Sequence, residues 1–155
     1  MLICLYFADL VVISIFKLVN NLIALSEKIL VLDSYITIKY DNVGDWLYAD
    51  WHGDQTEQSV MDGCEMMLHY LKQERCCKVL NDNTNVTSIW LDASKWVGED
   101  WFPRMNDAGL KYFAWVYSPN VYSRLSTDES LKYGGKSVAI TFESIETARQ
   151  WLKSV

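Results

Sequence analysis

The sequence predicts an α/β domain built on a mixed β-sheet, with an antiparallel hairpin at its start and parallel strands after it. Three observations predict this class. Two segments with strand-like alternation flank a turn at residues 41–45. Apolar strand-like runs and helical periodicities then alternate to the end of the chain, and a helix that crosses between two neighbouring strands makes them parallel. The expected order is β-β-α-β-α-β-α-β-α.

The hairpin is predicted by residue alternation. In Tyr35–Tyr40 the side chains of Ile36, Ile38 and Tyr40 point to one face, which is the period of a half-buried strand. Residues 41–45 have the composition of a turn, and 46–51 alternate again. The preceding residues 29–32 form only a short apolar run.

A helix is expected after the hairpin, from the N-cap residue Thr56 to about Gln73. Its apolar face consists of residues at helical spacing: Val60, Cys64, Met67, Leu68 and Leu71. Residues 77–81 then form a short strand, and the polar residues 81–85 are interpreted as the loop that follows it.

The second half of the chain repeats this alternation. Residues 93–108 have helical periodicity, but Pro103 removes a backbone donor, so we expect a kink or two short helices that end at Gly109. Tyr112–Tyr117 is almost continuously apolar, which is typical of a central strand buried on both faces.

Three further elements complete the order. A helix is expected over 121–132, a strand over 137–142, and a final helix over 144–153 that Ser144 caps. The chain of 155 residues fits one domain over residues 28–155.

Residues 1–27 form a separate apolar segment, which we expect to be helical. Asp9 and Lys17 interrupt it, so it lacks the ~20 apolar residues that span a bilayer, and it has no cleavage site of a signal peptide. Its wide apolar face has three interpretations. It docks on a protein surface or forms a homodimer, it contacts a membrane through residues 1–25, or it is foreign to the fold.

Composition and motifs exclude several function classes. A net charge of −6 argues against a nucleic-acid partner, because counterion release needs a basic surface. No phosphate-binding loop, dinucleotide fingerprint or zinc-protease motif is present, so no cofactor and no metal are expected. The four cysteines lack metal-site spacing, and we interpret them as reduced thiols of a cytoplasmic protein. The alternative is a peripheral membrane protein.

The chain from residue 29 to its end resembles the STAS domain of the anti-sigma-factor antagonists (SpoIIAA-like), a fold related to the CRAL-TRIO lipid-transfer domain, and is most similar to small bacterial stand-alone members. The segments that carry the resemblance are residues 46–51, 78–84, 101–104, 112–119 and 142–152. It implies a non-enzymatic regulatory module with a protein partner.

In this family, a Ser or Thr in the loop after the third strand accepts a phosphate from a partner kinase. The matching residues here are Asp82, Asn83, Thr84 and Asn85, which are therefore the expected partner or ligand surface, together with the helix that follows them. Thr84 is the expected phosphoacceptor. Asn83 stands where a Ser is common and Asn85 replaces a Gly, so the loop resembles a degenerate version.

Two alternative functions remain open. Trp90, Trp96 and Trp101 cluster around the second crossover helix and would line a pocket for a lipid or a small molecule, as the CRAL-TRIO resemblance implies. His52 has the chemistry of a general acid or base, and an unrecognised enzyme would use it together with Asp82.

Overall fold

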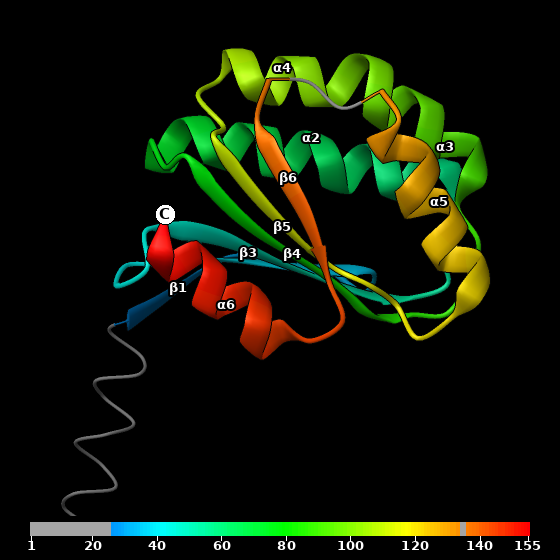
Figure 1. Cartoon of the computed structure of the whole chain (residues 1–155), viewed down its shortest axis with the longest axis horizontal. Coiled ribbons are helices and arrows are strands. Elements are labelled where there is room, and N and C mark those ends of the chain that lie inside the picture. Colours follow the sequence, from blue (N-terminus) through cyan, green and yellow to red (C-terminus); the bar gives the residue numbers. More distant parts are fainter. Residues whose placement is uncertain (1–25, 134–135) are drawn as a thin grey trace, which may run out of the picture.

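The computed structural model describes residues 26–133 and 136–155. This part of the chain forms one six-stranded sheet with helices on both faces (Figure 1). The strands follow one another across the sheet in the order of the sequence. They are β1 (Glu27–Leu32), β2 (Ile36–Asp41), β3 (Trp46–Gly53), β4 (Lys78–Val86), β5 (Tyr112–Val116) and β6 (Val138–Phe142).

The sheet is mixed, as the sequence predicts. β1, β2 and β3 pair antiparallel, and β3 to β6 pair parallel. The turn between β2 and β3 is closed by Asp41, whose Oδ1 accepts hydrogen bonds from the backbone N–H groups of Val43 (2.9 Å) and Gly44 (2.8 Å). Such Asx-type bonds are the reason why Asp and Asn favour turns. The predicted hairpin is thus confirmed.

The sequential strand order determines where the helices lie. Each connection from β3 to β6 moves one strand further in the same direction, and right-handed crossovers of this kind place their helices on one face. That face carries α2 (Glu57–Glu74), α3 (Leu91–Trp96), the π-helix η1 (Val97–Trp101), α4 (Phe102–Asp107) and α5 (Val121–Leu131). α6 (Ile145–Ser154) follows the last strand and packs on the opposite face (Figure 1).

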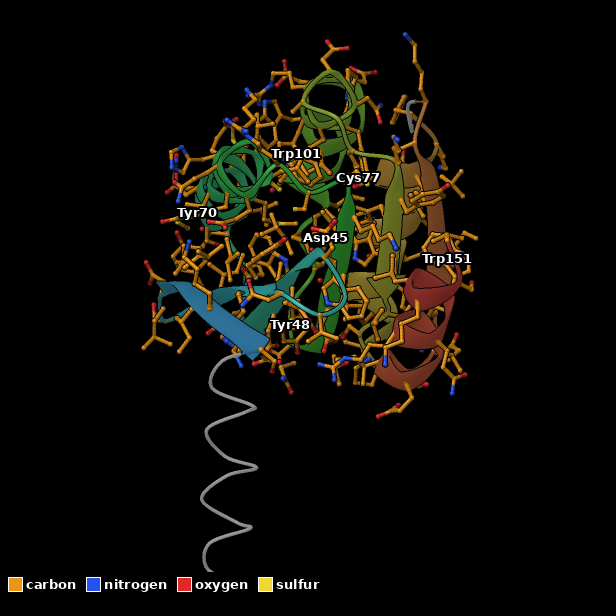
Figure 2. The ribbon with its side chains drawn as sticks, turned by 90° about the vertical axis from the view of Figure 1, so that its left-hand side faces the viewer. Asp45, Tyr48, Tyr70, Cys77, Trp101 and Trp151 are labelled. Atoms are coloured by element: carbon orange, nitrogen blue, oxygen red, sulfur yellow. The ribbon has the colours of Figure 1, made fainter. Side chains whose placement is uncertain are left out.

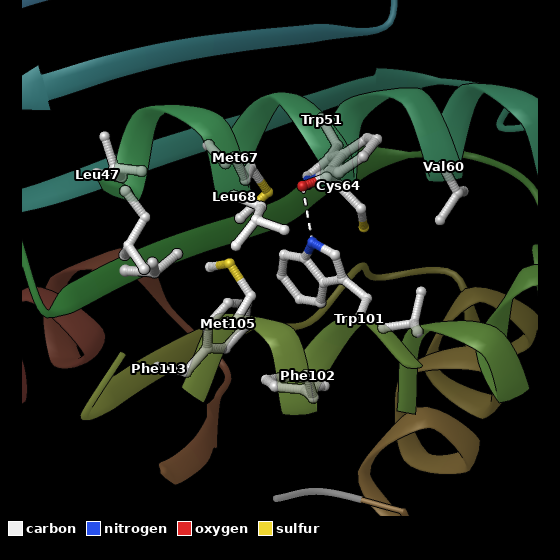
Figure 3. Packing of buried hydrophobic residues seen from close by; sticks show 14 of the residues in the cluster. Leu47, Trp51, Val60, Cys64, Met67, Leu68, Trp101, Phe102, Met105 and Phe113 are labelled. Atoms are coloured by element: carbon white, nitrogen blue, oxygen red, sulfur yellow. Dashed lines mark hydrogen bonds between the residues drawn. The ribbon is translucent and has the colours of Figure 1, made fainter. Parts of the chain in front are cut away.

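The main core lies between the sheet and the larger helix layer. Trp101, 1% exposed, is at its centre, and its ring meets those of Phe102 and Phe113 edge to face (Figure 3). The indole Nε1–H donates a 2.7 Å hydrogen bond to the backbone carbonyl of Cys64 on α2. This bond satisfies the polar atom of a buried tryptophan and fixes η1 against α2.

A smaller core lies beneath α6. Leu80, Ala114 and Val116 project from β4 and β5 toward the fully buried Ala148 and Leu152 of α6. Because β5 packs on both of its faces, Phe113–Val116 are all buried, which confirms the predicted burial on both faces. β5 is an interior strand that lies next to the edge strand β6. α6 contacts β4, β5 and β6, so its cover is confined to one half of this face.

The broken helix around Pro103 is confirmed. α3 passes into η1, and the N–H of Phe102 bonds the carbonyl of Val97, five residues earlier. Pro103 lacks an N–H donor, and the wider π-helical turn accommodates this gap immediately before the proline. Gly109 follows the end of α4 and has a φ of 108°. Residues with a Cβ atom disfavour this positive φ, which glycine adopts readily.

Two expectations about the start of the domain and the end of β4 need correction. Residues 29–32 belong to a full strand, β1, which begins at Glu27 and is paired with β2. The predicted loop 81–85 is instead the second half of β4. The apolar segment expected over residues 1–27 lies, up to residue 25, outside the described residues.

Candidate functional site

The four residues expected to form a recognition loop lie on a bulged strand. Asp50 of β3 pairs with Asp82, and His52 pairs with Asn85, so β4 uses two residues where β3 uses one. The extra residue locally turns the chain, as β-bulges do. Asp82 Oδ1 accepts bonds from the backbone N–H (2.9 Å) and the hydroxyl (2.5 Å) of Thr84. The turn-like sequence therefore forms a turn-like bulge inside a strand.

These residues are divided between the two faces of the sheet, because successive side chains of a strand point to opposite faces. Asp82 and Asn83 are 5% and 4% exposed, whereas Thr84 and Asn85 are exposed. Asn83 belongs to the helix-covered face, and Asp82 to the face that α6 half covers. Of the four expected surface residues, only Thr84 and Asn85 are accessible to a partner.

A polar cluster surrounds Asp82 on the half-covered face. The Tyr48 hydroxyl donates to Asp82 Oδ2 (3.1 Å), and the Arg149 guanidinium of α6 lies over the Tyr48 ring at 5.6 Å (Figure 2 labels Tyr48). Burial is the main cause that raises the pKa of Tyr48, and the carboxylates of Asp82 and Asp50 raise it further. The phenol therefore stays protonated and acts as a hydrogen-bond donor.

Asp50 lies next to Asp82 in the register of β3 and β4. Burial raises the pKa of Asp50, His52 lowers it, and the charge of Asp82 raises it again. His52 Nδ1 lies 3.6 Å from Asp50 Oδ1, and its Nε2 lies 3.2 Å from the Thr37 hydroxyl. The described partners of His52 are thus Asp50 and Thr37, and the contact with Asp82 that an enzyme around His52 requires is not among them.

On the helix-covered face, two asparagines of β4 form a buried chain of hydrogen bonds. Trp51 Nε1 donates to Asn81 Oδ1 (2.8 Å), and Asn81 Nδ2 donates to Asn83 Oδ1 (3.0 Å). These bonds compensate for the loss of water around the amide groups. Asn81 and Asn83 are consequently structural residues of the core rather than contacts for a partner.

The tryptophans expected to line a pocket lie beside a small cavity. Trp90 and Trp101 line it together with Asn81, Asn83 and Trp115, but its volume is only about 20 Å³. Such a volume holds roughly one water molecule, so a lipid does not fit. Trp96 lies elsewhere, with the Arg104 guanidinium 5.6 Å from its ring.

Polar residues at the carboxyl ends of the strands mostly bond to one another. The Thr87 hydroxyl donates to Asp54 (2.5 Å), the Ser118 hydroxyl donates to the carbonyl of Val86 (2.7 Å), and Arg124 forms a bidentate pair with Glu143. This edge of the sheet is therefore internally satisfied. Within residues 26–133 and 136–155, no group of three or more His, Cys, Asp or Glu residues is placed to hold a metal ion.

The surface that the sequence did not reveal is apolar. On α5, Val121, Tyr122 and Leu125 are 67%, 64% and 52% exposed. Ile89 and Leu91, 47% and 46% exposed, flank Trp90 at the start of α3. We call these five residues the α3–α5 patch.

Hydrogen bonds hold the two segments of the α3–α5 patch together. The backbone N–H of Trp90 donates to the Ser126 hydroxyl (3.1 Å), and its indole N–H donates to the Ser123 hydroxyl (3.3 Å). The buried serines of α5 thus face α3, and the apolar residues of α5 face outward. In the sequence, this surface is indicated only by the spacing of Val121, Tyr122 and Leu125 at i, i+1 and i+4. Whether these side chains are exposed depends on how α3 packs against α5.

Three of the four cysteines lie within the described residues. Cys64, Cys76 and Cys77 are free, and Cys4 lies outside the described residues. In the part of the chain that the structure covers, no helix has the length and hydropathy needed to cross a bilayer. Comparison of the chain with models of known protein families gives no match, and no curated protein matches it.

Proposed function

We propose that this chain is a non-enzymatic protein-interaction module of STAS-like type, and that it binds a protein partner through the α3–α5 patch. The observation that carries the proposal is the exposure of five apolar side chains, four on the neighbouring helices α3 and α5 and one, Ile89, in the segment before α3. Exposed apolar side chains on neighbouring elements of this kind mark protein-interaction surfaces. The resemblance to STAS domains supports the same class of function.

The patch lies near the position that the resemblance indicates. The expected recognition surface consists of residues 82–85, which lie on β4 of this structure, together with the helix that follows them. That helix is α3, and Leu91 is its first residue. We therefore assign partner binding to the apolar α3–α5 patch rather than to the polar residues 82–85. Of those polar residues, Thr84 and Asn85 are accessible on β4.

Phosphorylation of Thr84 would regulate the module in this proposal. Its hydroxyl bonds Asp82, and Asp50 lies on the neighbouring strand. A phosphate on Thr84 would add about two negative charges beside these carboxylates, and the like charges would repel each other. Phosphorylation would thus open the bulge rather than order it, and Thr84→Glu should loosen this end of β4 more than Thr84→Gln. Hydrogen exchange of the β4 amides measures the difference.

The partner surface is tested by a charged double variant, Tyr122→Glu with Leu125→Glu. Both side chains are exposed, so the fold should remain intact while a partner is lost. The matched control is Val43→Glu, since Val43 is 81% exposed in the β2–β3 turn. Quantitative affinity capture from the native cell extract measures binding. Partners that bind the wild type and the control but not the double variant support the proposal, and an unchanged set contradicts it.

We place the protein in the cytoplasm, where thiols stay reduced. Attachment to a membrane surface through residues 1–25 is the alternative, and fractionation of cells that produce the full chain separates the two locations. A chain recovered with the membranes contradicts the cytoplasmic assignment.

A further inference from the structure

The outer edge of β6 has backbone groups that no strand of the described residues pairs with. The N–H of Val138 donates to the carbonyl of Lys111, and the carbonyl of Phe142 accepts from the N–H of Tyr117. In a parallel strand, the N–H and C=O of one residue point to the same side and alternate along the chain. Val138, Ile140 and Phe142 therefore bond to β5, and Ala139 and Thr141 point their backbone groups outward. No strand of the described chain pairs with this side of β6.

The two edges of the sheet differ in how they oppose further pairing. β1 begins with the charged residues Glu27 and Lys28, and its register shifts between Ile29 and Val31. Charges and bulges of this kind prevent edge strands from pairing with other chains. β6 has the sequence Val-Ala-Ile-Thr-Phe, with no charge, no proline and no register shift against β5.

We propose that β6 pairs antiparallel with β6 of a second copy of this chain, with the two-fold axis at Ile140. In this register Ala139 lies opposite Thr141 of the second copy, and each such pair exchanges two backbone hydrogen bonds. The Ser137 N–H already donates to Asn106 Oδ1 (3.1 Å). The free edge is thereby limited to Ala139–Thr141, and centring on Ile140 uses all of it.

Side chains on the α6 face favour the same register. The side chains of Val138 and Ile140 are 48% and 38% exposed, although both are large and apolar. In the dimer Ile140 meets Ile140 of the second copy, and Val138 meets its Phe142. Apolar cross-strand pairs of this type stabilise antiparallel strands. Pairing would thus remove two exposed apolar side chains per copy from water.

A second copy is the occupant that fits this edge best. Two-fold pairing brings the exposed Lys136 of each copy near Glu143 of the other, a carboxylate that also pairs with Arg124 in its own copy. The pairing also closes on itself, because each copy has only one undefended edge among its described strands. The resulting sheet continues through both molecules, and the α3–α5 patch takes no part in this pairing.

Analytical ultracentrifugation of the full chain over a range of concentrations tests the proposal. The wild type should form dimers. Ala139→Pro should be monomeric yet folded, since the N–H that it removes points away from β5. Ile140→Lys should also be monomeric, because it places two like charges on the axis. The matched control is Leu32→Lys on β1, where the exposed side chain belongs to the other edge, and it should dimerise like the wild type.

A wild type that is monomeric at every concentration overturns the proposal, and so does a dimer that survives both Ala139→Pro and Ile140→Lys. Circular dichroism establishes that the variants are folded. Register is tested separately by mild oxidation. Ile140→Cys should form an intermolecular disulfide, because the side chains meet on the axis, whereas Val138→Cys should crosslink no more than the wild type. Equal crosslinking at both positions overturns the register.

Discussion

At the scale of single residues, the tryptophans that line the small cavity differ in their hydrogen bonds. Trp51 Nε1 donates to Asn81, whereas the buried Nε1 of Trp115 has no partner among the described residues. Both side chains are nearly inaccessible, at 5% and 4% exposure, and both line the same cavity. They therefore form a natural pair for measuring what one buried hydrogen bond contributes to stability.

We predict that Trp51→Phe lowers the free energy of unfolding more than Trp115→Phe does. Both substitutions remove a similar volume, but only Trp51→Phe leaves the carbonyl oxygen of Asn81 unpaired in the core. Such an unpaired group costs about 1–3 kcal/mol. Urea unfolding of the two variants gives the difference, and equal losses would contradict the assigned hydrogen bond.

Asp50 makes the stability of the fold depend on pH. Burial raises the pKa of Asp50, so the folded state holds this proton more tightly than the unfolded chain does. Its contribution to stability is therefore full below the unfolded pKa and is lost as pH rises through the folded pKa. At neutral pH the ionised carboxylate is a cost.

Asp50→Asn should accordingly raise the free energy of unfolding at neutral pH, and its advantage should shrink as the pH falls through the acidic range. The control is Asp107→Asn, because the side chain of Asp107 is exposed. Unfolding by urea at a series of pH values measures both variants. A stability gain that does not change with pH would refute the role assigned to Asp50.

At the scale of the elements, η1 joins the helix layer through a close approach. A Cβ built on Gly98 would lie 2.5 Å from the carbonyl oxygen of Ser130 and 2.8 Å from Cβ of Tyr133. The backbone of η1 can therefore approach the end of α5 only because residue 98 lacks a side chain. α5 in turn presents buried serines, rather than large apolar residues, toward α3 and η1.

Gly98→Ala should separate η1 from α5 and destabilise the protein by about 1–3 kcal/mol, the usual cost of overpacking a close contact. Glu99→Ala is the control, since its side chain is 47% exposed and surface substitutions usually change stability by less than about 0.5 kcal/mol. Thermal unfolding monitored by circular dichroism compares the two. A stable Gly98→Ala variant would mean that α5 moves freely.

The elements also show how far sequence reasoning reaches. Alternation in 35–40 and 46–51 was sufficient for the hairpin, because one face of those strands is buried and the other is not. The Asp-Asn-Thr-Asn segment was misread as a loop, because the same hydrogen bond from the N–H of Thr84 to Asp82 Oδ1 closes a turn or a bulge. Only pairing with β3 distinguishes them, and pairing is a long-range property.

Site residues were less predictable for the same reason. The sequence singled out Thr84, which is exposed, but it also singled out Asn83, which is buried. The contact between Tyr48 and Asp82 joins residues 34 positions apart, and no local pattern encodes it. The α3–α5 patch likewise depends on how two short helices pack. A polar segment of the sequence shows which functional groups are present, whereas the solvent exposure of those groups depends on the whole fold.

At the scale of the whole molecule, α6 is the sole helix of the described chain on its face of the sheet. It docks through Leu152 and Ala148, and Lys78 Nζ donates a 2.9 Å hydrogen bond to the carbonyl of Leu152. Because few residues form this second core, each contributes strongly. The main core on the opposite face distributes its contacts over five helical segments.

Leu152→Ala should lower the free energy of unfolding by about 2–5 kcal/mol, the range found for large-to-small substitutions in well-packed cores. The neighbouring Lys153→Ala is the control, since Lys153 is exposed. Urea unfolding with tryptophan fluorescence measures both, and Trp151 on α6 reports the local environment. A loss similar to that of Lys153→Ala would show that α6 is not part of the cooperative unit.

The sequential order of the strands has a kinetic consequence. Every strand pairs with its neighbours in the chain, but a crossover helix separates the two strands of each parallel pair from β3 to β6. Such parallel pairing closes long loops and is slow, whereas the antiparallel strands β1 to β3 close short loops. During synthesis, each new strand emerges next to a partner that is already made, and the sheet can grow in the direction of translation. Only α6, which returns to β4 and β5, must wait for the end of the chain.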